Sequence, residues 1–598
     1  MANYYNDNEK IKFEVGQNAL MQRIVALKER DFADKGQYDY APEDYEDAMD
    51  SYSRVLDIVG EVTADVVAPN AEAVDAEGPH CEGGRVRYAE KTVENLDVMT
   101  KAGMNGMTMP RRYGGLNLPV TVYTAANEIV STGDASFENI WSLQDCIETL
   151  YCFGNEEQRQ KYIPRVCAGE TMSMDLTEPD AGSDLQSVML KATYDEENQC
   201  WRLNGSKRFI TNGDSDIHLV LARSVEGTRD GRGLSMFIYD KRNGGVDVRH
   251  IEHKLGIHGS PTCELTYKNA KAELCGSTRL GLIKYVMALM NGARLGIAAQ
   301  SVGLSQEAYN EAVAYARERQ QFGQKIQEFP GVYDMLSRMK AKLDAGRSLL
   351  YQTACYVDVY KCLEDIERDR KLTPEEKQEL KKYQRLADAF TPLAKGMNSE
   401  YANQNAYDAI SVHGGSGFIM EYKSQRLYRD ARIFSIYEGT TQLQVVAAIR
   451  YISNGTMLQN IKDLAAAVSS AAVPSAAVSS AAVPSAAVPS AAVPDASPSG
   501  LKARVEALIP VYEEALNAAK ALDSQEAFDF LARRLYDMTA ELVMSLLIIR
   551  DAAACPELFA KSANVYVRMA EENILGKAAY IKNFKADDLA CFRAATAE

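Results

Sequence analysis

A five-residue repeat near the C-terminus is the feature that most limits how this chain can fold. Ser-Ala-Ala-Val-Pro recurs through residues 470–494, with Ser479 in the place of one proline. Proline at this spacing prevents a continuous helix, and the small side chains bury little apolar surface. The repeat therefore predicts a semi-extended linker, assigned to residues 461–499, which separates a long N-terminal part from a shorter C-terminal part.

Both parts are predicted to be rich in helix. Residues 1–165 and 278–460, before the linker, show apolar residues at helical spacing. Residues 500–598, after it, predict a small helical domain. The face that this last domain is expected to bury carries Phe528, Leu531, Leu535 and Met538.

Residues 166–277 have a different pattern, which predicts a β domain. Short runs rich in β-branched and aromatic residues alternate with turn signals, and Asn204-Gly205 between two such runs predicts a β-hairpin. The expected fold class is α+β and mostly α: a helical N-terminal domain, a central β domain, a helical bundle and an extra C-terminal helical domain. The sequence has neither alternating strand–helix units nor GxGxxG, so a Rossmann-type nicotinamide site is not expected.

Charge and cysteine spacing exclude several classes of function. The net charge of −17 argues against nucleic acid as a partner. The eleven cysteines form no CxxC pair, and His250 and His253 lack further ligands nearby, so no metal site is expected. We expect no transmembrane segment, and the polar N-terminus does not resemble a secretory signal, which together favour a cytoplasmic protein.

Glu438 is the candidate general base. It follows the apolar and aromatic run Ile433-Phe434-Ser435-Ile436-Tyr437 and precedes Gly439. Apolar neighbours raise the pKa of a carboxyl group toward neutral pH, which suits a group that takes up a proton. Gly439 leaves room for a substrate carbonyl to approach the backbone. An ordinary surface glutamate at a turn has the same local pattern, so this run alone leaves both interpretations open.

Three further segments carry groups that suit a flat or phosphorylated ligand. Residues 176–184 form a loop of hydroxyls and small residues, which can hydrogen-bond a heterocycle or a phosphate. Phe209 and Thr211 present a ring and a hydroxyl on one face of a strand. Arg294 begins an otherwise apolar helix, and Arg319, one long helix later, could bind a pyrophosphate. The plainer alternatives are a connecting loop, a core ring, and arginines that reach solvent or interact with a helix dipole.

Together these segments resemble the acyl-CoA dehydrogenase family. TEPDAGSD at 177–184, RFITNG at 208–213, RQQFG at 319–323 and IYEGTTQ at 436–442 occur in the family's order, within about residues 50 to 460. Residues 411–418, Ser-Val-His-Gly-Gly-Ser-Gly-Phe, match a further motif, which often opens with Gln where this chain has Ser411. The length and the added C-terminal domain are similar to those of the larger bacterial members.

The resemblance implies a flavoenzyme, with FAD between the β domain and the second helical domain. Thr177, Phe209 and Thr211 match positions that contact the flavin ring, and Phe209 stands where Trp is often found. Ser183 matches a position close to the cofactor and the acyl-CoA. The positions that match those holding the rest of FAD, partly across a subunit interface, are Arg319, Phe322, Gly414, Gly415, Thr440 and Gln442.

The resemblance also assigns the chemistry. Glu438 matches the catalytic base; the other position that the family uses, one residue before Arg294, is Ala293 here and cannot act. Glu438 would remove the α proton while the β hydride passes to the flavin, and its backbone N–H would polarise the thioester carbonyl. The residues expected near the acyl-CoA are Ser183, Asn291, Arg294, Tyr437 and Gly439.

The implied function is an FAD-dependent acyl-CoA dehydrogenase. It would convert an acyl-CoA thioester to the trans-2-enoyl-CoA and pass electrons to an electron-transfer flavoprotein, as a homodimer or homotetramer. The alternatives are an acyl-CoA oxidase, which uses oxygen, and a non-catalytic relative with a binding role. Retained Glu438 and the charge of −17 argue against the non-catalytic alternative. The sequence does not place the residues that set the acyl chain length.

Overall fold

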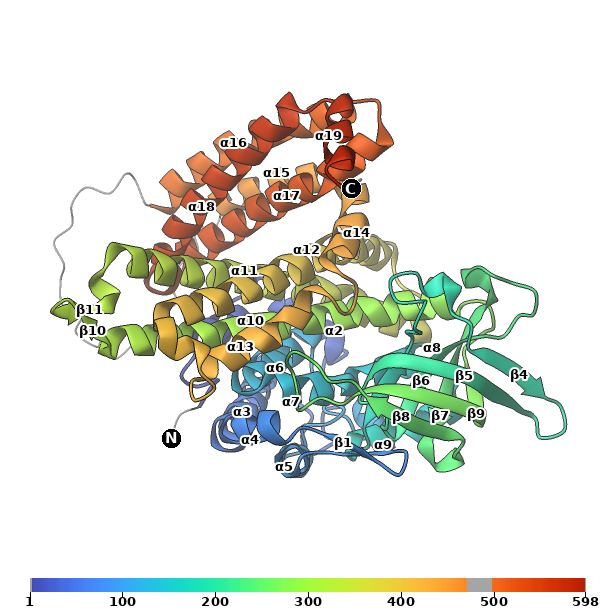
Figure 1. The fold of residues 1–598 in the computed structure, drawn as a ribbon. Coiled ribbons are helices and arrows are strands. Elements are labelled where there is room, and N and C mark those ends of the chain that lie inside the picture. The colour runs from blue at the N-terminus through green and yellow to red at the C-terminus, as the bar shows by residue number, and fades with distance from the viewer. Residues whose placement is uncertain (1–2, 471–496, 597–598) are drawn as a thin grey trace.

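The N-terminal helices surround one helix that is buried on all sides. In the computed structural model, which describes residues 3–470 and 497–596, this central helix is α6 (Val120–Gly133), with residues 121–133 all buried. The other helices of this part are α1 (Glu9–Gly16), α2 (Met21–Lys28), α3 (Tyr45–Val62), α4 (Ala68–Glu77), α5 (Glu90–Lys101), α7 (Ala135–Trp141), α8 (Cys146–Phe153) and α9 (Glu156–Cys167). A small hairpin, β1 (His80–Glu82) with β2 (Arg85–Arg87), lies beside the next domain (Figure 1).

The β domain is a seven-stranded sheet that curls back on itself. Its strands are β3 (Met172–Asp175), β4 (Lys191–Asp195), β5 (Cys200–Thr211), β6 (Ile217–Arg223), β7 (Leu234–Asp240), β8 (Val246–Ile251) and β9 (Thr262–Cys275). The order is β3-β6-β4-β5-β9-β7, and β7 pairs again with β6, which closes the ring. Because β6 and β7 are buried at every position, they form the core of this domain.

The predicted hairpin at Asn204-Gly205 is wrong. β5 runs straight through this dipeptide, and the register with β9 shifts between Leu203 and Gly205. The extra residue lies on β9, where Asn269 has a positive φ and donates its backbone N–H to Asn204 Oδ1 at 2.8 Å. Asn-Gly here serves a β-bulge, because tertiary pairing with a long neighbouring strand outweighs the local turn preference.

Four long helices form the second helical domain. They are α10 (Met287–Glu318), α11 (Pro330–Asp369), α12 (Pro374–His413) and α14 (Thr441–Ser453), with the shorter α13 (Lys423–Ala431) between the last two. A short hairpin, β10 (Gln320–Gln321) with β11 (Gln324–Lys325), caps the end of α10 that lies far from the β domain (Figure 1).

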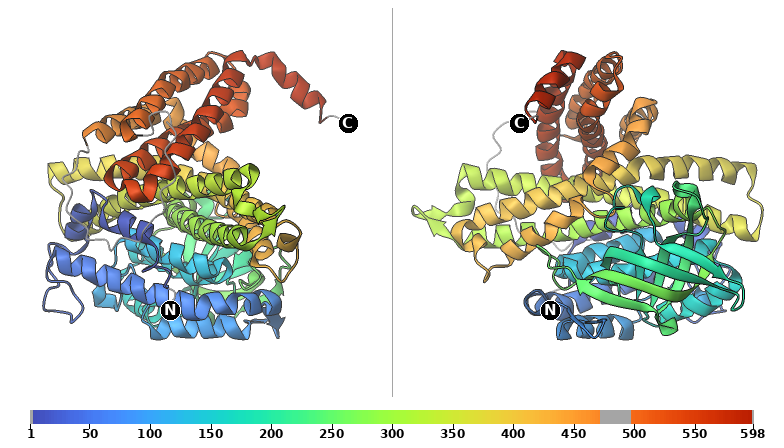
Figure 2. Two further views of the ribbon diagram at one scale, coloured as in Figure 1. Left: turned by 90° about the vertical axis from the view of Figure 1, so that its left-hand side faces the viewer. Right: turned by 45° about the vertical axis from the view of Figure 1, so that its right-hand side comes forward.

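One helical stretch, Gly281–Glu318, is long and apolar enough to cross a membrane by length and composition alone. The expectation that the chain has no segment of this length was therefore wrong as a statement about length. In the structure α10 packs against α6 and α12 (Figure 2), and 39% of the most apolar stretch of this helix is buried. Its buried positions include Leu295, Ala298 and Val302.

The C-terminal helices stack on the bundle. α15 (Thr456–Ser470), α16 (Pro498–Lys520), α17 (Gln525–Ala554), α18 (Pro556–Asn583) and α19 (Leu589–Ala594) form this part, and α17 and α18 both pack on α11. α15 extends through residues 461–470, so this part of the predicted linker is helical; residues 471–496 of the linker lie outside the described residues. The predicted class, α+β and mostly helical, is confirmed.

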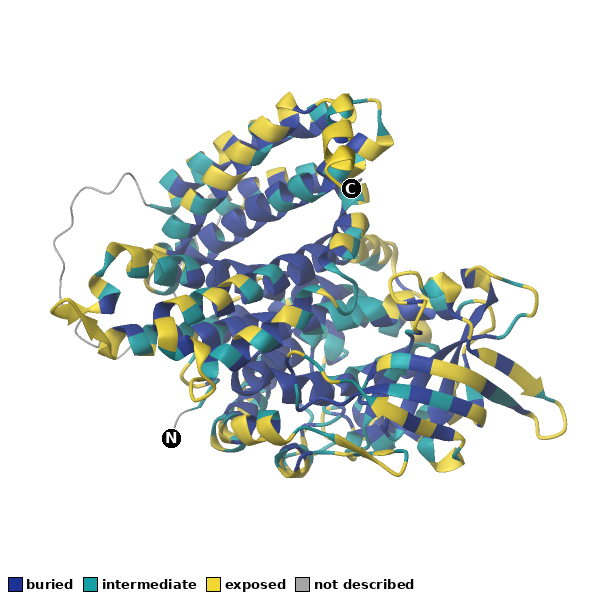
Figure 3. Ribbon diagram, viewed as in Figure 1, coloured by how far each residue is buried: buried dark blue, intermediate teal, exposed yellow. Residues whose placement is uncertain are grey.

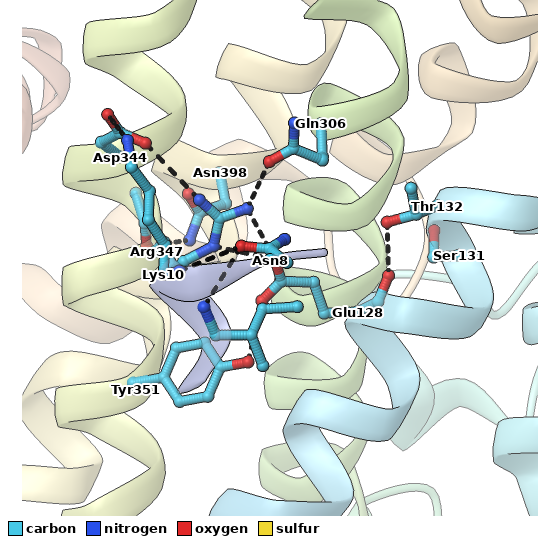
Figure 4. Close-up of polar contacts among 12 residues, drawn as sticks. Asn8, Lys10, Glu128, Ser131, Thr132, Gln306, Asp344, Arg347, Tyr351 and Asn398 are labelled. Atoms are coloured by element: carbon cyan, nitrogen blue, oxygen red, sulfur yellow. Dashed lines mark hydrogen bonds and ion pairs between the residues drawn. The ribbon is translucent and has the colours of Figure 1, made fainter. Parts of the chain in front are cut away.

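A buried ionic cluster joins the parts of the molecule. Arg347 on α11 is fully buried and donates from Nε to Glu128 Oε1 on α6 at 2.8 Å and from Nη2 to Gln306 Oε1 on α10 at 2.9 Å. Asp344, one turn before Arg347, is bound by Lys10 of α1 and by the hydroxyl of Ser562 of α18. Figure 4 shows Lys10, Glu128 and Gln306, from three separate helices, converging on Asp344 and Arg347 of α11. Figure 3 shows that the centre of the bundle around them is buried.

Replacement of Arg347 by Met is expected to destabilise the whole protein. The change leaves Glu128 buried without its cation, and breaking a buried pair costs about 3–5 kcal/mol. In thermal unfolding, the midpoint temperature of the first transition should be several degrees lower than in the wild type. The matched control is Arg338→Met, which breaks an exposed pair with Asp334 on the same helix and should cost less than about 1 kcal/mol. Equal transition temperatures for both variants would contradict this account.

Candidate functional site

Glu438 and Gly439 form a strained loop between the turn of residues 432–435 and α14. Glu438 has φ of 54° and Gly439 has φ of 89°, so two successive residues are left-handed. This conformation is costly for glutamate and persists only where surrounding contacts enforce it. Those contacts converge on the Gly439 carbonyl, which accepts hydrogen bonds from Lys395 Nζ at 2.7 Å and Gln444 Nε2 at 2.8 Å. Thr440 then caps α14 by accepting from the Leu443 N–H at 3.3 Å.

Gly439 cannot carry a larger side chain without a change in these contacts. A Cβ there would lie 2.9 Å from Gln444 Nε2 and 3.8 Å from Arg294 Nη2. The loop therefore holds the Glu438 carboxylate close to α10 and α12. Gly439 allows this because it has no side chain to collide with the neighbouring helices. The groups that approach Gly439 closely are side chains of the protein itself, and the predicted approach of a substrate carbonyl stays a prediction.

Two cations face the Glu438 carboxylate. Burial raises the pKa of Glu438 to about 7, and the charges of Lys395 and Arg294 act in the opposite direction. Burial also lowers the pKa of Lys395 to about 7, against the effect of Glu438. Arg294 donates from Nη1 to Asn291 Oδ1 at 3.3 Å, and its buried Nε has no partner within residues 3–470 and 497–596. A carboxylate in this setting can take up and return a proton near neutral pH.

A small cavity of about 70 Å³ lies beside Glu438. Its walls come from α6, α7, the turn before α8, β3, β5 and α10, so all of the first three domains contribute. Among the predicted residues, Thr211, Tyr437 and Glu438 line it, together with Ala293. The Tyr437 hydroxyl donates to Gln300 Oε1 on α10, which fixes the ring at the cavity wall.

The loop at Thr177 is held in place by a buried ion pair. Lys207 on β5 is fully buried and donates from Nζ to Glu178 Oε1 at 2.9 Å and to the Leu176 carbonyl at 2.8 Å. Glu178 also accepts the backbone N–H groups of Met189 and Leu190. The loop thus crosses the end of β5, with Thr177 half-buried and Ser183 exposed on the surface.

A β-bulge presents Phe209 to solvent. The register between β5 and β9 shifts between Lys207 and Ile210, and Phe209 has φ of 59°. The bulge interrupts the regular alternation on which the predicted common face of Phe209 and Thr211 depended. Phe209 is 52% exposed, and the Arg208 guanidinium lies 4.9 Å from the centre of its ring. An exposed ring beside the cavity-lining Thr211 leaves a flat apolar surface available to a ligand.

The predicted residues fall into two groups at opposite ends of α10. Asn291 and Arg294 lie near its start, next to Glu438, with Thr440 and Gln442 close in sequence at the start of α14. Arg319, Phe322, Gly414 and Gly415 are all exposed at its other end. Arg294 and Arg319 are roughly 38 Å apart along the helix. The structure of one chain therefore does not bring the two groups into one site.

The far group is nevertheless locally ordered. Tyr315 of α10 stacks on His413 at 4.4 Å and lies 3.3 Å from the Ser416 hydroxyl, which fixes the glycine turn against α10. Gly414 ends α12 with φ of 61°. Around this turn, the exposed apolar side chains include Phe322 by 94%, Phe418 by 83%, Met420 by 69% and Ile419 by 46%.

Sequence reasoning missed the residues that support Glu438. Lys395, Gln444 and Gln300 hold the loop and Tyr437, and Asp145 lines the cavity. Lys395 left one signal, a lone charge within the apolar residues 390–397. Gln300 and Asp145 have no local signature, because each acts through a contact with a distant segment. Gln444 lies only five residues after Gly439, close to the motif residues Thr440 and Gln442. Within the described part of the chain, no group of three or more His, Cys, Asp or Glu could hold a metal ion.

Four family models match the chain in succession. They are described as the acyl-CoA dehydrogenase N-terminal domain (residues 50–170), middle domain (residues 173–270) and C-terminal domain (residues 283–451), and as acyl-CoA dehydrogenase C terminal (residues 490–589). The last match covers most of the helical region beyond the linker.

Known proteins are similar over most of the same length. The 3-methylmercaptopropionyl-CoA dehydrogenase of Ruegeria pomeroyi is 34% identical over an alignment of 422 residues that covers 66% of this chain and 69% of that protein. The caffeyl-CoA reductase-Etf complex subunit CarC of Acetobacterium woodii is 32% identical over 59% of this chain and 87% of its own length. The crystal structure of an acyl-CoA dehydrogenase complexed with FAD from Bacillus anthracis shares the fold, with a TM-score of 0.71, 22% identity and coverage of 91% of this chain and 90% of that one.

Proposed function

The chain belongs to the acyl-CoA dehydrogenase family, and from this premise we propose that it oxidises an acyl-CoA thioester to the trans-2-enoyl-CoA with FAD as its cofactor. The observation that carries the proposal is the setting of Glu438. It combines a carboxyl pKa raised to about 7, two facing cations and a small cavity in one place. A general base works best when its pKa lies near the working pH.

The residues on the β-domain side fit a flavin ring. Phe209 is exposed at a bulge, Thr211 lines the Glu438 cavity, and the Thr177 loop crosses the same end of β5. When bound there, FAD supplies a hydride acceptor, which no amino-acid side chain provides. Arg319 and the turn at Gly414 and Gly415 suit the phosphate end of the cofactor, since a guanidinium can bind a pyrophosphate and the glycines leave their backbone open.

The chain's own residues divide the remaining work. Glu438 Oε takes the α proton of the acyl group, and its backbone N–H donates to the thioester oxygen, on which negative charge develops. Lys395 is a positioning residue: it holds the Gly439 carbonyl and lowers the pKa of the base. Arg294 and Asn291 lie beside the loop, and Arg294 contributes a positive charge next to Glu438. The cavity walls exclude bulk water from these groups.

The two groups of residues at opposite ends of α10 support a homodimeric or larger assembly. One chain cannot place Arg319 near its own Phe209, because α10 separates the ends of the bundle by roughly 38 Å. A second copy can supply the Arg319 end. Exposed Phe322, Phe418 and Met420 offer the apolar surface that such a contact would bury.

We also propose an electron-transfer flavoprotein as the electron acceptor. The support is the A. woodii relative, which is named as a subunit of a complex with such a protein. An oxidase would instead pass electrons to oxygen. Mixing the substrate-reduced protein with air separates the two, since rapid peroxide formation would contradict the dehydrogenase proposal.

The proposed function is tested with Glu438→Gln. The amide keeps the shape of the side chain but cannot take up a proton at neutral pH. FAD and acyl-CoA should still bind, while anaerobic flavin bleaching by a good substrate should slow by at least the ~10²–10⁴-fold of a lost general base. Glu400→Gln is the control, because Glu400 also faces Lys395 electrostatically but does not line the cavity. Bleaching of Glu438→Gln at the wild-type rate would reject Glu438 as the base.

Lys395→Met should shift the pH dependence of the same reaction. Loss of this cation raises the pKa of Glu438 above about 7. Because the base must be ionised, the rise in bleaching rate with pH moves to higher pH, and the rate at pH 7 falls. Lys342→Met is the control, since Lys342 is another buried lysine, on α11, whose Nζ lies 3.8 Å from Asp408 instead. An unchanged midpoint for Lys395→Met would show that Lys395 does not tune the base.

Phe322→Asp should separate the subunits. A charge at the most exposed apolar side chain of the proposed contact disfavours its burial. Light scattering should show smaller particles than for the wild type, and FAD content should fall with them. Val93→Asp, at an exposed position of α5, should change neither. A wild-type protein that is a single chain in solution and retains FAD would refute the shared site.

A further inference from the structure

The wall of the Glu438 cavity carries a second carboxylate, Asp145. Asp145 ends the turn Ser142–Asp145 and lines the cavity together with Glu438. From residues 3–470 and 497–596, no hydrogen bond or ion pair reaches its carboxylate. The nearest cation in the wall, Lys361, is bound by Glu148 at 2.6 Å. A hydrocarbon chain bound in this pocket would bury the carboxylate of Asp145 without giving it a hydrogen bond, which costs free energy.

Asp145 faces the start of α10. A Cβ on Gly292 would lie 3.1 Å from Asp145 Oδ2, so the glycine leaves space in front of the carboxylate. Both carboxylates, Asp145 and Glu438, act electrostatically on the same thiol, that of the buried Cys146, and raise its pKa together with burial. The second carboxylate therefore lies within electrostatic reach of the catalytic one and in the same cavity.

A second unpartnered acceptor lines the same wall. Asn127 of α6 is 2% exposed, and its amide oxygen has no hydrogen-bond partner in the part of the chain that the structure describes. A buried acceptor without a donor costs free energy, of the order of 1–3 kcal/mol. A ligand that brings a donor removes this cost, and a ligand that lacks one leaves it in place.

Charged side chains also lie in the space beyond Asp145. Asp145, Lys361, Gly292, Leu289 and Val120 line both this cavity and a neighbouring one of about 250 Å³. The neighbouring walls include the charged side chains of Lys28, Arg30, Arg112, Glu148, Glu364 and Arg368. A long alkyl chain that passed Asp145 would enter this charged space and strip water from it, which is unfavourable.

We infer that the acyl group is short and carries a hydrogen-bond donor, a hydroxyl or an amine, at its end remote from the thioester, and that Asp145 and Asn127 accept its hydrogen bonds. The inference rests on the proposed function, because it names the substrate class of the same cavity. The small volume beside Glu438, about 70 Å³, sets the short length. Burial and the neighbouring Glu148 raise the pKa of Asp145 to about 7, against the effect of Lys361, so a donor stabilises a charge that is otherwise disfavoured.

Binding to the FAD-loaded Glu438→Gln protein tests this inference without turnover. Calorimetry compares hexanoyl-CoA with 5-hydroxypentanoyl-CoA and 5-aminopentanoyl-CoA, which replace the terminal methyl by a donor of similar size. At least one polar ligand should bind tenfold or more tightly than hexanoyl-CoA. If hexanoyl-CoA binds at least as tightly as both polar ligands, the inference is overturned by this measurement alone.

Substitution of Asp145 in the same background assigns the effect. Asp145→Leu should reverse the preference in favour of hexanoyl-CoA, and Asp145→Asn should keep a preference for the hydroxyl while losing one for the amine. Glu364→Gln is the control, since Glu364 lines only the neighbouring cavity and should leave the ratio unchanged. A ratio unaffected by both Asp145 variants would overturn the role of this residue.

The failure of this inference can be told from the failure of the proposed function. Anaerobic flavin bleaching of the wild-type protein is measured with the same three ligands. If none of these or other acyl-CoA thioesters bleaches the flavin, the proposed function fails. If hexanoyl-CoA bleaches it fastest, the function stands and the inference about a polar acyl group fails.

Discussion

The buried ionic cluster around Arg347 is the contact on which the arrangement of the helices depends. Its members come from α1, α6, α10, α11 and α18, so a single charge centre reaches the N-terminal helices, the bundle and the C-terminal helices. Apolar contacts between helices are not directional and allow small shifts of one helix along another. A buried guanidinium must instead meet its carboxylate and amide partners in one geometry. The cluster thereby fixes α10 against α6, and these two helices form much of the wall beside Glu438.

The catalytic loop depends on a second layer of contacts. Glu438 adopts a left-handed conformation because Lys395 and Gln444 both bind the next carbonyl. α17 of the C-terminal region packs against the same part of α12. The Tyr536 hydroxyl donates to the Pro392 carbonyl at 2.8 Å, and a Cβ on Gly396 would lie 2.1 Å from the Tyr536 oxygen. Gly396 follows Lys395 in sequence, so α17 contacts α12 next to the lysine whose charge lowers the pKa of Glu438. This gives the added domain a structural role near the site, distinct from covering a surface.

The length of α10 shapes the site as a whole. It begins at the cavity beside Glu438 and ends at exposed Arg319, with no bend that would return the chain to its own β domain (Figure 1). In our proposal the cofactor draws these two ends from two copies of the chain, while the reacting acyl group needs only one. Asp145 lies beside the start of the same helix, so in this proposal the base acts on the α carbon and Asp145 contacts the remote end of the acyl group.

The sequence by itself determined the class of fold and the family, because both can be recognised from local sequence patterns. Apolar spacing marks the helices, and short contiguous motifs carry Glu438, Thr177, Thr211 and Arg319. It failed where distant segments decide the local structure: Asn204-Gly205 lies within β5 opposite a bulge because β9 pairs across it, and residues 461–470 of the predicted linker are helical. Only the tertiary structure brought Asp145 to the cavity and Lys395 to the Gly439 carbonyl, and divided the motif residues between two ends of the bundle. The physical reason is that a pKa, a strained backbone and a cavity wall are properties of neighbours in space, and those neighbours lie tens to hundreds of residues away along the chain.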